Sequence, residues 1–270
     1  MGTTDNFDSP VATSLALTDK FPVISAATGR AATGTLQKLD DLVKGKQYVR
    51  LFDDFLGDVI ADQWSAAQGT DGQGAIAAVV AGAAGGAVRL TCGDTVTVSE
   101  SLSSLTHGLN WKANQGGLVF ETKVTPGASV ASVAYFIGLT DVLATTTLEE
   151  PATLATATIT YNAADAVGFL FDTGATTDVF YGVGVKATTG IAFASALAGS
   201  APVASTAVTL KIEVSATGTA TFYIDGVSIG SLANAVTATV ALTPIISIMA
   251  RTTATKTIDV DYIDLKALRA

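Results

Sequence analysis

One pair of carboxylates in this sequence has a spacing that could support chemistry. Asp259 and Asp261 are two residues apart in an alternating segment, so in a β-strand both would point to the same face. Two carboxylates on one face can act as nucleophile and acid in glycoside hydrolysis. We interpret this pair instead as solvated charges on an outer face, opposite an inward stripe formed by Ile258, Val260 and Tyr262.

The other nucleophiles and bases lack partners. Glu149 and Glu150 are adjacent, so an extended backbone would point them to opposite faces. His107 is the only histidine, and no G-x-S-x-G elbow accompanies it. Cys92 has no basic neighbour in sequence that would make it a thiolate. We interpret His107 as a surface-loop residue and Cys92 as buried, assign no catalytic residue, and predict that the protein is not an enzyme.

One tryptophan could belong to a sugar site. In "GLNWKANQGG", the Trp111 ring could stack on a sugar while the amides of Asn110, Asn114 and Gln115 hydrogen-bond the sugar hydroxyls. The interpretation that we favour is structural, with Trp111 capping one edge of a sheet. Trp111 and Asn114 therefore remain a secondary hypothesis for ligand binding.

Four aspartates near the start of the β pattern could offer oxygen ligands to calcium. They are Asp53, Asp54, Asp58 and Asp62. Their spacing does not match the D-x-[DN]-x-[DN]-G loop. The glycine-rich "AGAAGG" that follows residue 80 lacks the lysine and the helix start of a phosphate-binding loop. We predict neither a metal nor a cofactor.

Composition excludes several classes of protein. The net charge of −9 argues against nucleic-acid binding, which needs clustered Lys and Arg. No apolar run approaches the ~18 residues of a membrane-spanning helix, and the first ten residues do not resemble a secretory signal. A single cysteine excludes internal disulfides. We therefore predict a protein made in the cytoplasm that binds neither nucleic acid nor membrane.

The first 47 residues form a distinct N-terminal module, with five basic and five acidic groups against ten and nineteen in the remainder. Its pattern predicts an extended arm, a strand at 21–24, a turn region at 26–34 and a helix that Thr35 caps. A helix this short must bury its apolar stripe, either on its own β domain or on a neighbouring subunit. We favour the subunit and predict these partner-binding residues: Phe21, Val23, Leu36, Leu39, Leu42 and Val43.

From residue 48 to residue 270 the pattern is β almost throughout. One segment alternates polar residues, Lys211, Glu213 and Ser215, with apolar ones, Leu210 and Ile212. This alternation indicates a strand with one solvent-exposed face. An Asp-Gly pair at 225–226 predicts a tight hairpin. Many short strands with turn signals between them predict a sandwich or a barrel. After an opening segment at 48–57, the expected strands are 86–92, 95–99, 117–124, 132–140, 155–161, 166–172, 178–187, 206–215, 219–224, 227–232, 244–251 and 257–265.

Several motifs carry a resemblance to a known fold family. They are "FDDF" with a following Trp in 52–66, "GLVFETKV" at 117–124, "YFIGLTD" at 135–141, "VGFLFD" at 167–172, "FYIDGVSIG" at 222–230 and "IDVDYIDL" at 258–265. Their order resembles the concanavalin A-like lectin/glucanase jelly roll, in particular the laminin-G-like versions in tailed-bacteriophage virion proteins. The resemblance implies an all-β sandwich preceded by the N-terminal arm. The E-x-D-x-E strand of the glucanases of this fold has no match in the sequence.

The resemblance and the N-terminal module together imply a phage virion structural protein. We predict a capsid decoration (cement) protein on the outer capsid surface, docked on the major capsid protein or another virion protein and assembled as a homotrimer. The alternative is a tail appendage, or a lectin-like protein that binds a receptor or glycan. A concave sheet that carries exposed aromatic residues would favour the alternative.

Overall fold

The computed structural model describes residues 20–24, 31–35, 47–68, 76–93, 102–143 and 150–269. The chain divides into two compact units, Met1–Tyr48 and Val49–Ala270. In the first unit, strands β1 (Lys20–Ile24) and β2 (Ala31–Thr35) form an antiparallel pair. The strand predicted at 21–24 is therefore confirmed.

The turn predicted for residues 26–34 is wrong over its second half, because residues 31–34 pair with β1. Thr35 is the last residue of β2. The predicted helix, with Leu36, Leu39, Leu42 and Val43, lies outside the described residues, as do the side chains of Phe21 and Val23. The attachment role of residues 1–47 stays a prediction.

The second unit is a sandwich of two antiparallel sheets. We call one of them the solvent-facing sheet. Its strands follow the order β18 (Val227–Leu232), β17 (Ala220–Ile224), β16 (Val208–Val214), β8 (Leu118–Pro126), β20 (Lys256–Leu268), β6 (Val88–Cys92) and β5 (Ile76–Val79), with β3 (Tyr48–Asp53) also paired to β20.

We call the other sheet the covered sheet. Its strands follow the order β14 (Thr189–Gly190), β13 (Tyr181–Lys186), β12 (Ala166–Asp172), β9 (Val133–Thr140), β19 (Thr243–Ala250), β7 (Leu102–Thr106) and β4 (Ser65–Gln68), with β15 (Leu197–Ala198) also paired to β13. A hairpin of β10 (Ala152–Ala155) and β11 (Thr158–Tyr161) and two 3-10 turns, η1 (Ala113–Gln115) and η2 (Phe193–Ser195), complete the described elements.

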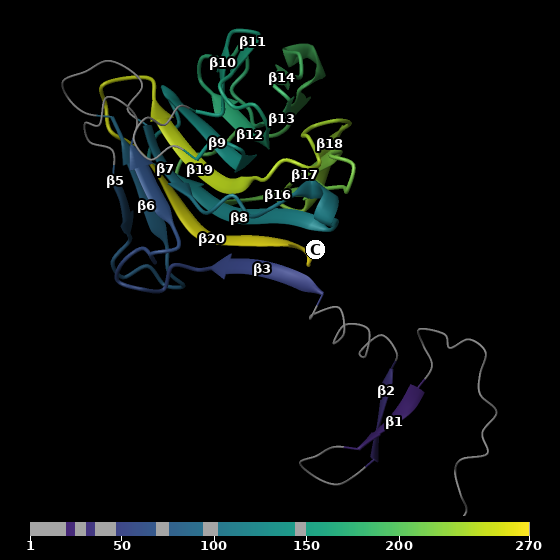
Figure 1. The fold of residues 1–270 in the computed structure, drawn as a ribbon. Helices are drawn as coiled ribbons and strands as arrows, with labels where there is room; N and C mark the ends of the chain where they lie inside the picture. The colour runs from purple at the N-terminus through teal and green to yellow at the C-terminus, as the bar shows by residue number, and fades with distance from the viewer. Residues whose placement is uncertain are drawn as a thin grey trace, which may run out of the picture. The chain divides into compact units, whose positions relative to one another are not determined.

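The two sheets differ in how their outer faces meet solvent. Strands of the solvent-facing sheet alternate, so Lys211 and Glu213 in β16 point outward while Leu210 and Ile212 are buried, as predicted. Every residue of β9, β12 and β19 is buried instead. The β10–β11 hairpin stands over the outer side of the covered sheet (Figure 1). Only the solvent-facing sheet therefore offers a broad face for recognition in the described part of the sandwich.

Two apolar clusters account for this burial. The larger one fills the space between the sheets and includes Phe169, which makes edge-to-face contact with Phe180 and Phe222. The smaller one lies on the outer side of the covered sheet, where Phe136 and Leu154 are fully buried. Sequence patterning predicted most strands of both clusters, but not β7, which contributes Leu105, nor the hairpin strand β10, which contributes Leu154.

A β-bulge in β20 changes the face of one predicted residue. The pairing register with β8 shifts between Val260 and Tyr262, so Asp261 is an extra residue. Ile258 and Val260 are buried, as predicted. Tyr262, predicted to point inward, points outward instead, because the bulge reverses the alternation and buries Ile263. No helix among the described residues is both long and apolar enough to cross a membrane.

Candidate functional site

Trp111 lies in the core rather than on the surface. Its side chain is 4% exposed, and its backbone forms a bridge with Leu242 through hydrogen bonds of 3.2 and 2.7 Å. The indole N–H is buried and has no hydrogen-bond partner among the described residues. The ring is therefore not available to stack on a sugar in this conformation.

The amides that flank Trp111 do meet in one place. Asn110, Lys112, Asn114 and Gln115 line an open hollow, which we call the amide hollow. The Lys112 backbone N–H donates to Gln115 Oε1 at 2.8 Å, which fixes that amide beside η1. The hollow offers hydrogen-bond donors and acceptors but no exposed aromatic ring.

Asp53 has a structural role in the loop after β3. Its carboxylate accepts hydrogen bonds from the Phe55 backbone N–H at 2.8 Å, from Gln63 Nε2 at 3.0 Å and from the Trp64 indole at 2.7 Å. These bonds use acceptor positions that a calcium ion would need. Across the described parts of the chain, no group of three or more acidic, His or Cys side chains is arranged to hold a metal.

His107 and Cys92 lack catalytic surroundings. The imidazole of His107 is half-buried and lies edge-on to Trp64 with ring centroids 5.5 Å apart. Cys92 is fully buried, and this burial raises the pKa of its thiol to about 12. A reactive thiolate is therefore not available at neutral pH.

An aromatic pair lies on the outer face of the solvent-facing sheet, between β3 and β20. Phe52 is 50% exposed and stacks on Tyr262 with ring centroids 6.2 Å apart and planes at 30°. Tyr262 donates its hydroxyl to Glu121 Oε1 at 2.8 Å, and burial together with this hydrogen bond raises the pKa of Tyr262. The carboxylate of Glu121 thus holds the Tyr262 ring in place.

An ion pair frames this aromatic pair. Arg50 donates to Asp264 through two hydrogen bonds of 2.7 and 2.8 Å, and its guanidinium carbon lies 5.1 Å from the centroid of the Phe52 ring. Such two-point pairs fix orientation as well as charge. We call these five residues the aromatic platform: Arg50, Phe52, Glu121, Tyr262 and Asp264.

Further charges on this face are also paired. Arg89 pairs with Asp259, Lys123 with Asp261, and Lys211 with Glu213. The Lys211 ammonium also lies 4.4 Å from the centroid of the Tyr223 ring, whose hydroxyl donates to Glu213 at 3.0 Å. Most of the face is therefore electrically balanced and its aromatic rings are held by neighbours.

The outer side of the covered sheet holds two buried carboxylates. Glu150 accepts a hydrogen bond from the Ser247 hydroxyl, and burial raises the pKa of Glu150 to about 8. Asp172 pairs with Arg251 and accepts the backbone N–H of Leu154 at 2.9 Å. Asp172 is near enough to add to the raised pKa of Glu150.

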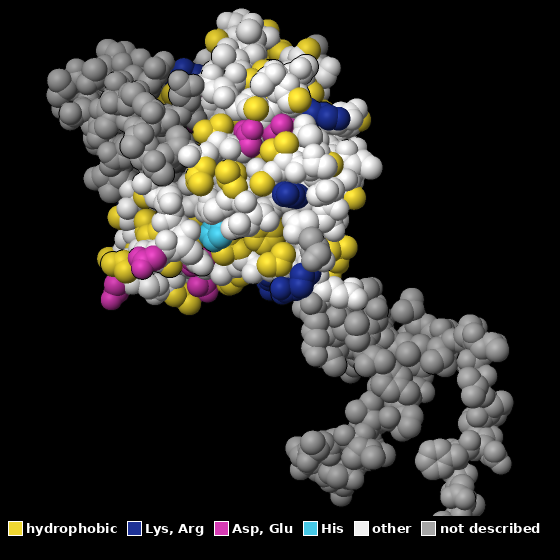
Figure 2. Space-filling model, viewed as in Figure 1, with side chains coloured by type: hydrophobic (Ala, Val, Ile, Leu, Met, Phe, Trp, Pro, Cys, Tyr) yellow, Lys and Arg dark blue, Asp and Glu magenta, His cyan; other side chains and the backbone are white. Residues whose placement is uncertain are grey.

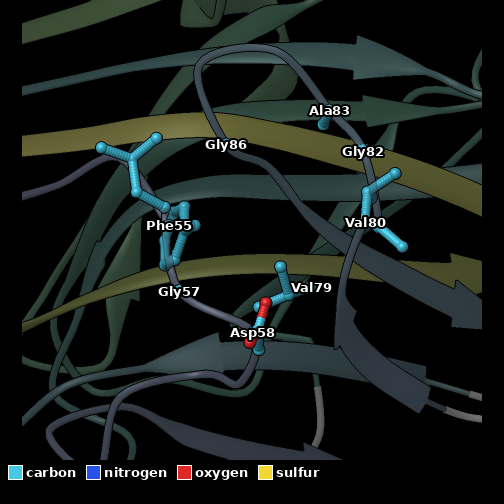
Figure 3. A pocket seen from close by; sticks show the side chains of 10 residues that line it. Phe55, Gly57, Asp58, Val79, Val80, Gly82, Ala83 and Gly86 are labelled. Atoms are coloured by element: carbon cyan, nitrogen blue, oxygen red, sulfur yellow. The ribbon is translucent and has the colours of Figure 1, made fainter.

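A small hollow lies where the loop after β3 meets the turn after β5 (Figure 3). Phe55, Gly57 and Asp58 line one side, and Val80 and the glycine-rich turn line the other. Its lining is mainly backbone and apolar side chains, with one carboxylate. These groups do not define a ligand.

Sequence reasoning missed both the platform and the buried carboxylates. Tyr262 belongs to the alternating segment "IDVDYIDL", and strict alternation predicts that its ring points inward. The bulge after Val260 turns the ring outward instead. The partners Glu121 and Arg50 come from strands far away in sequence. Glu150 was considered only as the neighbour of Glu149, although its partner is Ser247, 97 residues away.

No protein-family model matches the sequence, and no curated protein matches it in sequence. Solved structures do share its fold. A protein of unknown function from Shewanella oneidensis has a TM-score of 0.55 at 16% identity, over 86% of this chain and 96% of its own. The Bacillus licheniformis beta-glucanase has a TM-score of 0.53 at 12% identity, over 80% and 97%. The Emp47p carbohydrate recognition domain has a TM-score of 0.53 at 9% identity, over 83% and 98%.

These likenesses confirm the predicted concanavalin A-like jelly-roll sandwich. They contradict the prediction that the chain is not an enzyme, because a glucanase is among the proteins that share its fold. That prediction assumed that catalytic carboxylates must stand in one E-x-D-x-E strand. The structure has two buried carboxylates, Glu150 and Asp172, that belong to no such strand.

Proposed function

We propose that the sandwich binds a carbohydrate on the aromatic platform. The proposal depends on the Phe52 ring, which is 50% exposed and lies beside the Tyr262 ring with planes at 30°. A fixed aromatic surface of this kind suits the apolar C–H face of a sugar ring, since it combines contact area with low conformational freedom. Two of the proteins that share the fold, a carbohydrate recognition domain and a glucanase, support this choice of ligand.

Polar groups around the ring can take the sugar hydroxyls. Glu121 uses Oε1 for Tyr262, and its Oε2 has no hydrogen bond to a described residue. The Arg50 side chain is 57% exposed beside the ring, with Asp264 as its partner. A few fixed polar groups around an apolar contact are what orients a small ligand.

A glycan array probed with the full chain tests the proposal. The wild type is expected to bind one glycan class, and Phe52→Ala to bind it at least about tenfold more weakly, the loss of about 1.4 kcal/mol. Val203→Ala, which changes a side chain 60% exposed outside the platform, serves as the matched control and should bind as the wild type does. An array without any bound glycan, or equal binding by Phe52→Ala, would overturn the proposal.

A second candidate function is cleavage of a glycan, and the two buried carboxylates favour it. Glu150 has a pKa raised to about 8 and so carries a proton at neutral pH, while Asp172 forms an ion pair with Arg251. An acid that carries a proton at neutral pH is one of the two carboxyl groups that glycosidases use. Both side chains are buried, so a substrate would reach them only if the neighbouring segments move.

Release of reducing ends from a bound glycan tests the second candidate. The wild type should cleave and Glu150→Gln should not, because glutamine cannot supply the proton. Glu213→Gln, a carboxylate on the other sheet, should cleave like the wild type. Cleavage by Glu150→Gln at the wild-type rate would exclude Glu150 as the acid.

The capsid decoration role, the trimer and the virion location stay predictions. They depend on the apolar stripe from Leu36 to Val43, which lies outside the described residues. The sandwich supports the alternative of glycan recognition better than it supports decoration. Quantifying the chain in purified particles against a major capsid protein would test the decoration role.

A further inference from the structure

A group of unpaired cations lies at one end of the sandwich. Lys112, Lys266 and Arg269 are all exposed, and none forms an ion pair with a described residue. The cations of the sheet face differ, since Arg50 and Lys211 are already paired with carboxylates. Lys186 and Lys256 also form no ion pair with a described residue, but Lys186 is hydrogen-bonded to Asn234 and Lys256 is buried.

Backbone hydrogen bonds bring these cations to the same end. The Leu268 N–H, between Lys266 and Arg269 in sequence, donates to Gly116 O at 2.9 Å, directly after η1. The Asn114 N–H donates to Ala238 O at 2.9 Å, which adds the segment before β19. Figure 2 shows Lys and Arg side chains on this side of the sandwich, above and below the position that C marks in Figure 1.

The segments that meet here contain no carboxylate, although Glu213 of β16, which is paired with Lys211, is near enough to Lys266 to interact with its charge. Residues 110–119, 232–242 and 265–270 contain no Asp or Glu, although the whole chain has a net charge of −9. The amide hollow lies within this region and adds neutral donors and acceptors from Asn110, Asn114 and Gln115. A local excess of positive charge in an acidic protein attracts an anionic group.

We infer that the amide hollow, with Lys112 in its lining and Lys266 and Arg269 on the neighbouring C-terminal segment, binds the acidic group of a saccharide, the carboxylate of a uronic or sialic acid or a sulfate. Ammonium and guanidinium groups give strong hydrogen bonds to such anions, and the amides take neighbouring hydroxyls. This inference rests on the proposed function and deepens it, because it names the glycan class as acidic.

The hollow and the aromatic platform lie along one strand. Tyr262 and Leu268 are both in β20, six residues apart, which corresponds to about 20 Å of extended strand. Lys266 lies between them on the outer face and is paired in register with Val119. An oligosaccharide can therefore stack on Phe52 and place its acidic residue at the hollow.

Titration calorimetry with matched glycans tests the inference. The full chain is titrated with oligosaccharides of alginate, polygalacturonate and hyaluronan, and with the same samples after reduction of their carboxylates to alcohols. For one of them the acidic form should bind about tenfold more tightly, since hydrogen bonds to a charged group are stronger than those to a neutral one. Added salt should reduce this preference.

Charge variants locate the effect. The double variant Lys112→Gln, Lys266→Gln should lose the preference for the acidic form, whereas Arg89→Gln, which removes a cation paired with Asp259 outside the hollow and the platform, should keep it. Equal affinity for both forms, with Phe52→Ala still weakening them, would overturn the inference and leave the proposed function standing. Binding of neither form would overturn the inference, and the glycan array would then decide the proposed function separately.

Discussion

The indole N–H of Trp64 donates to the carboxylate of Asp53 at 2.7 Å, and the same carboxylate accepts the Phe55 N–H at 2.8 Å. One side chain thus fastens the segment that joins β3 to β4 while Trp64 itself is buried in the core. This relationship explains why Asp53 is better described as a loop anchor than as a calcium ligand.

Loss of this anchor should cost stability. Asp53→Ala leaves the buried Trp64 N–H without its acceptor, so the free energy of unfolding should fall by roughly 2–3 kcal/mol. Asp54→Ala is the matched control, because the Asp54 carboxylate forms no hydrogen bond with a described residue, and its effect should stay within about 0.5 kcal/mol. Urea unfolding measures both. Equal losses in the two variants would contradict the anchoring role.

The buried Glu150 should make stability fall as pH rises. Its pKa is raised by burial from 4.5 to about 8, so between these values the folded protein binds more protons than the unfolded chain. The free energy of unfolding should therefore decrease with pH in this window, by at most about 1.4 kcal/mol per unit from this group. Below the window the carboxyl is protonated in both states and contributes nothing to the pH dependence of stability.

Glu150→Gln isolates this effect. The variant should match the wild type near pH 4 and be more stable at pH 8, measured by urea unfolding across the range. Glu213→Gln is the control with the opposite sign, because the hydrogen bond from Lys211 lowers the pKa of Glu213. Its stabilisation is present above the ordinary glutamate pKa and is lost as pH falls. A Glu150→Gln variant that is less stable at pH 8 would contradict the raised pKa.

Two glycines in the turn after β5 should respond differently to alanine. Gly86 has φ +80°, and an added Cβ would lie 2.0 Å from the Asp54 carbonyl oxygen. Gly82 has φ +75°, but an added Cβ would meet nothing within 4 Å. Figure 3 shows both on the turn beside Phe55. Gly82→Ala should cost about 1 kcal/mol from backbone strain alone, and Gly86→Ala clearly more, because backbone atoms must move.

Thermal unfolding of the two variants checks this difference. The Gly86→Ala variant should melt at a lower temperature than Gly82→Ala. The same melting temperature for both would show that the contact between the Asp54–Phe55 segment and the turn can relax, and the packing argument would fail.

The sequence predicts the strands well because their signals are local. Alternating apolar and polar residues identify β16, and a nearly continuous apolar run identifies β12. Both strands lie within the predicted ranges. The Asp225-Gly226 turn joins β17 to β18 as expected, with positive φ at both residues. Strands β4, β5, β7 and most of β10 were missed, because short segments rich in Ala, Ser and Thr carry little apolar contrast. The strand predicted at 95–99 lies outside the described residues.

The candidate sites depend on contacts that local patterns do not encode. The amide hollow was within reach of the sequence, since Asn110, Asn114 and Gln115 are close neighbours along the chain. The platform was not, because Phe52 meets Tyr262 across 210 positions and a bulge decides which way the tyrosine points. Pairing register over such separations is set by the packing of the whole sandwich.

Deletion of single residues in β20 tests whether the bulge sets the direction of the Tyr262 side chain. Deletion of Asp261 removes the extra residue and leaves Val260 inward and Tyr262 outward, so the register with β8 is kept on both sides. The variant loses the Lys123–Asp261 pair, which is partly exposed, and should be destabilised by no more than about 2 kcal/mol.

Deletion of Asp259 is the matched control, because it removes one residue from a regularly paired part of β20. The buried side chains Ile258 and Val260 would then become neighbours, and one of them would have to face solvent. This variant should fold poorly or not at all, which circular dichroism and urea unfolding would show. Two deletions with the same effect would mean that the register of β20 does not depend on the bulge, and the outward position of Tyr262 in the platform would need another explanation.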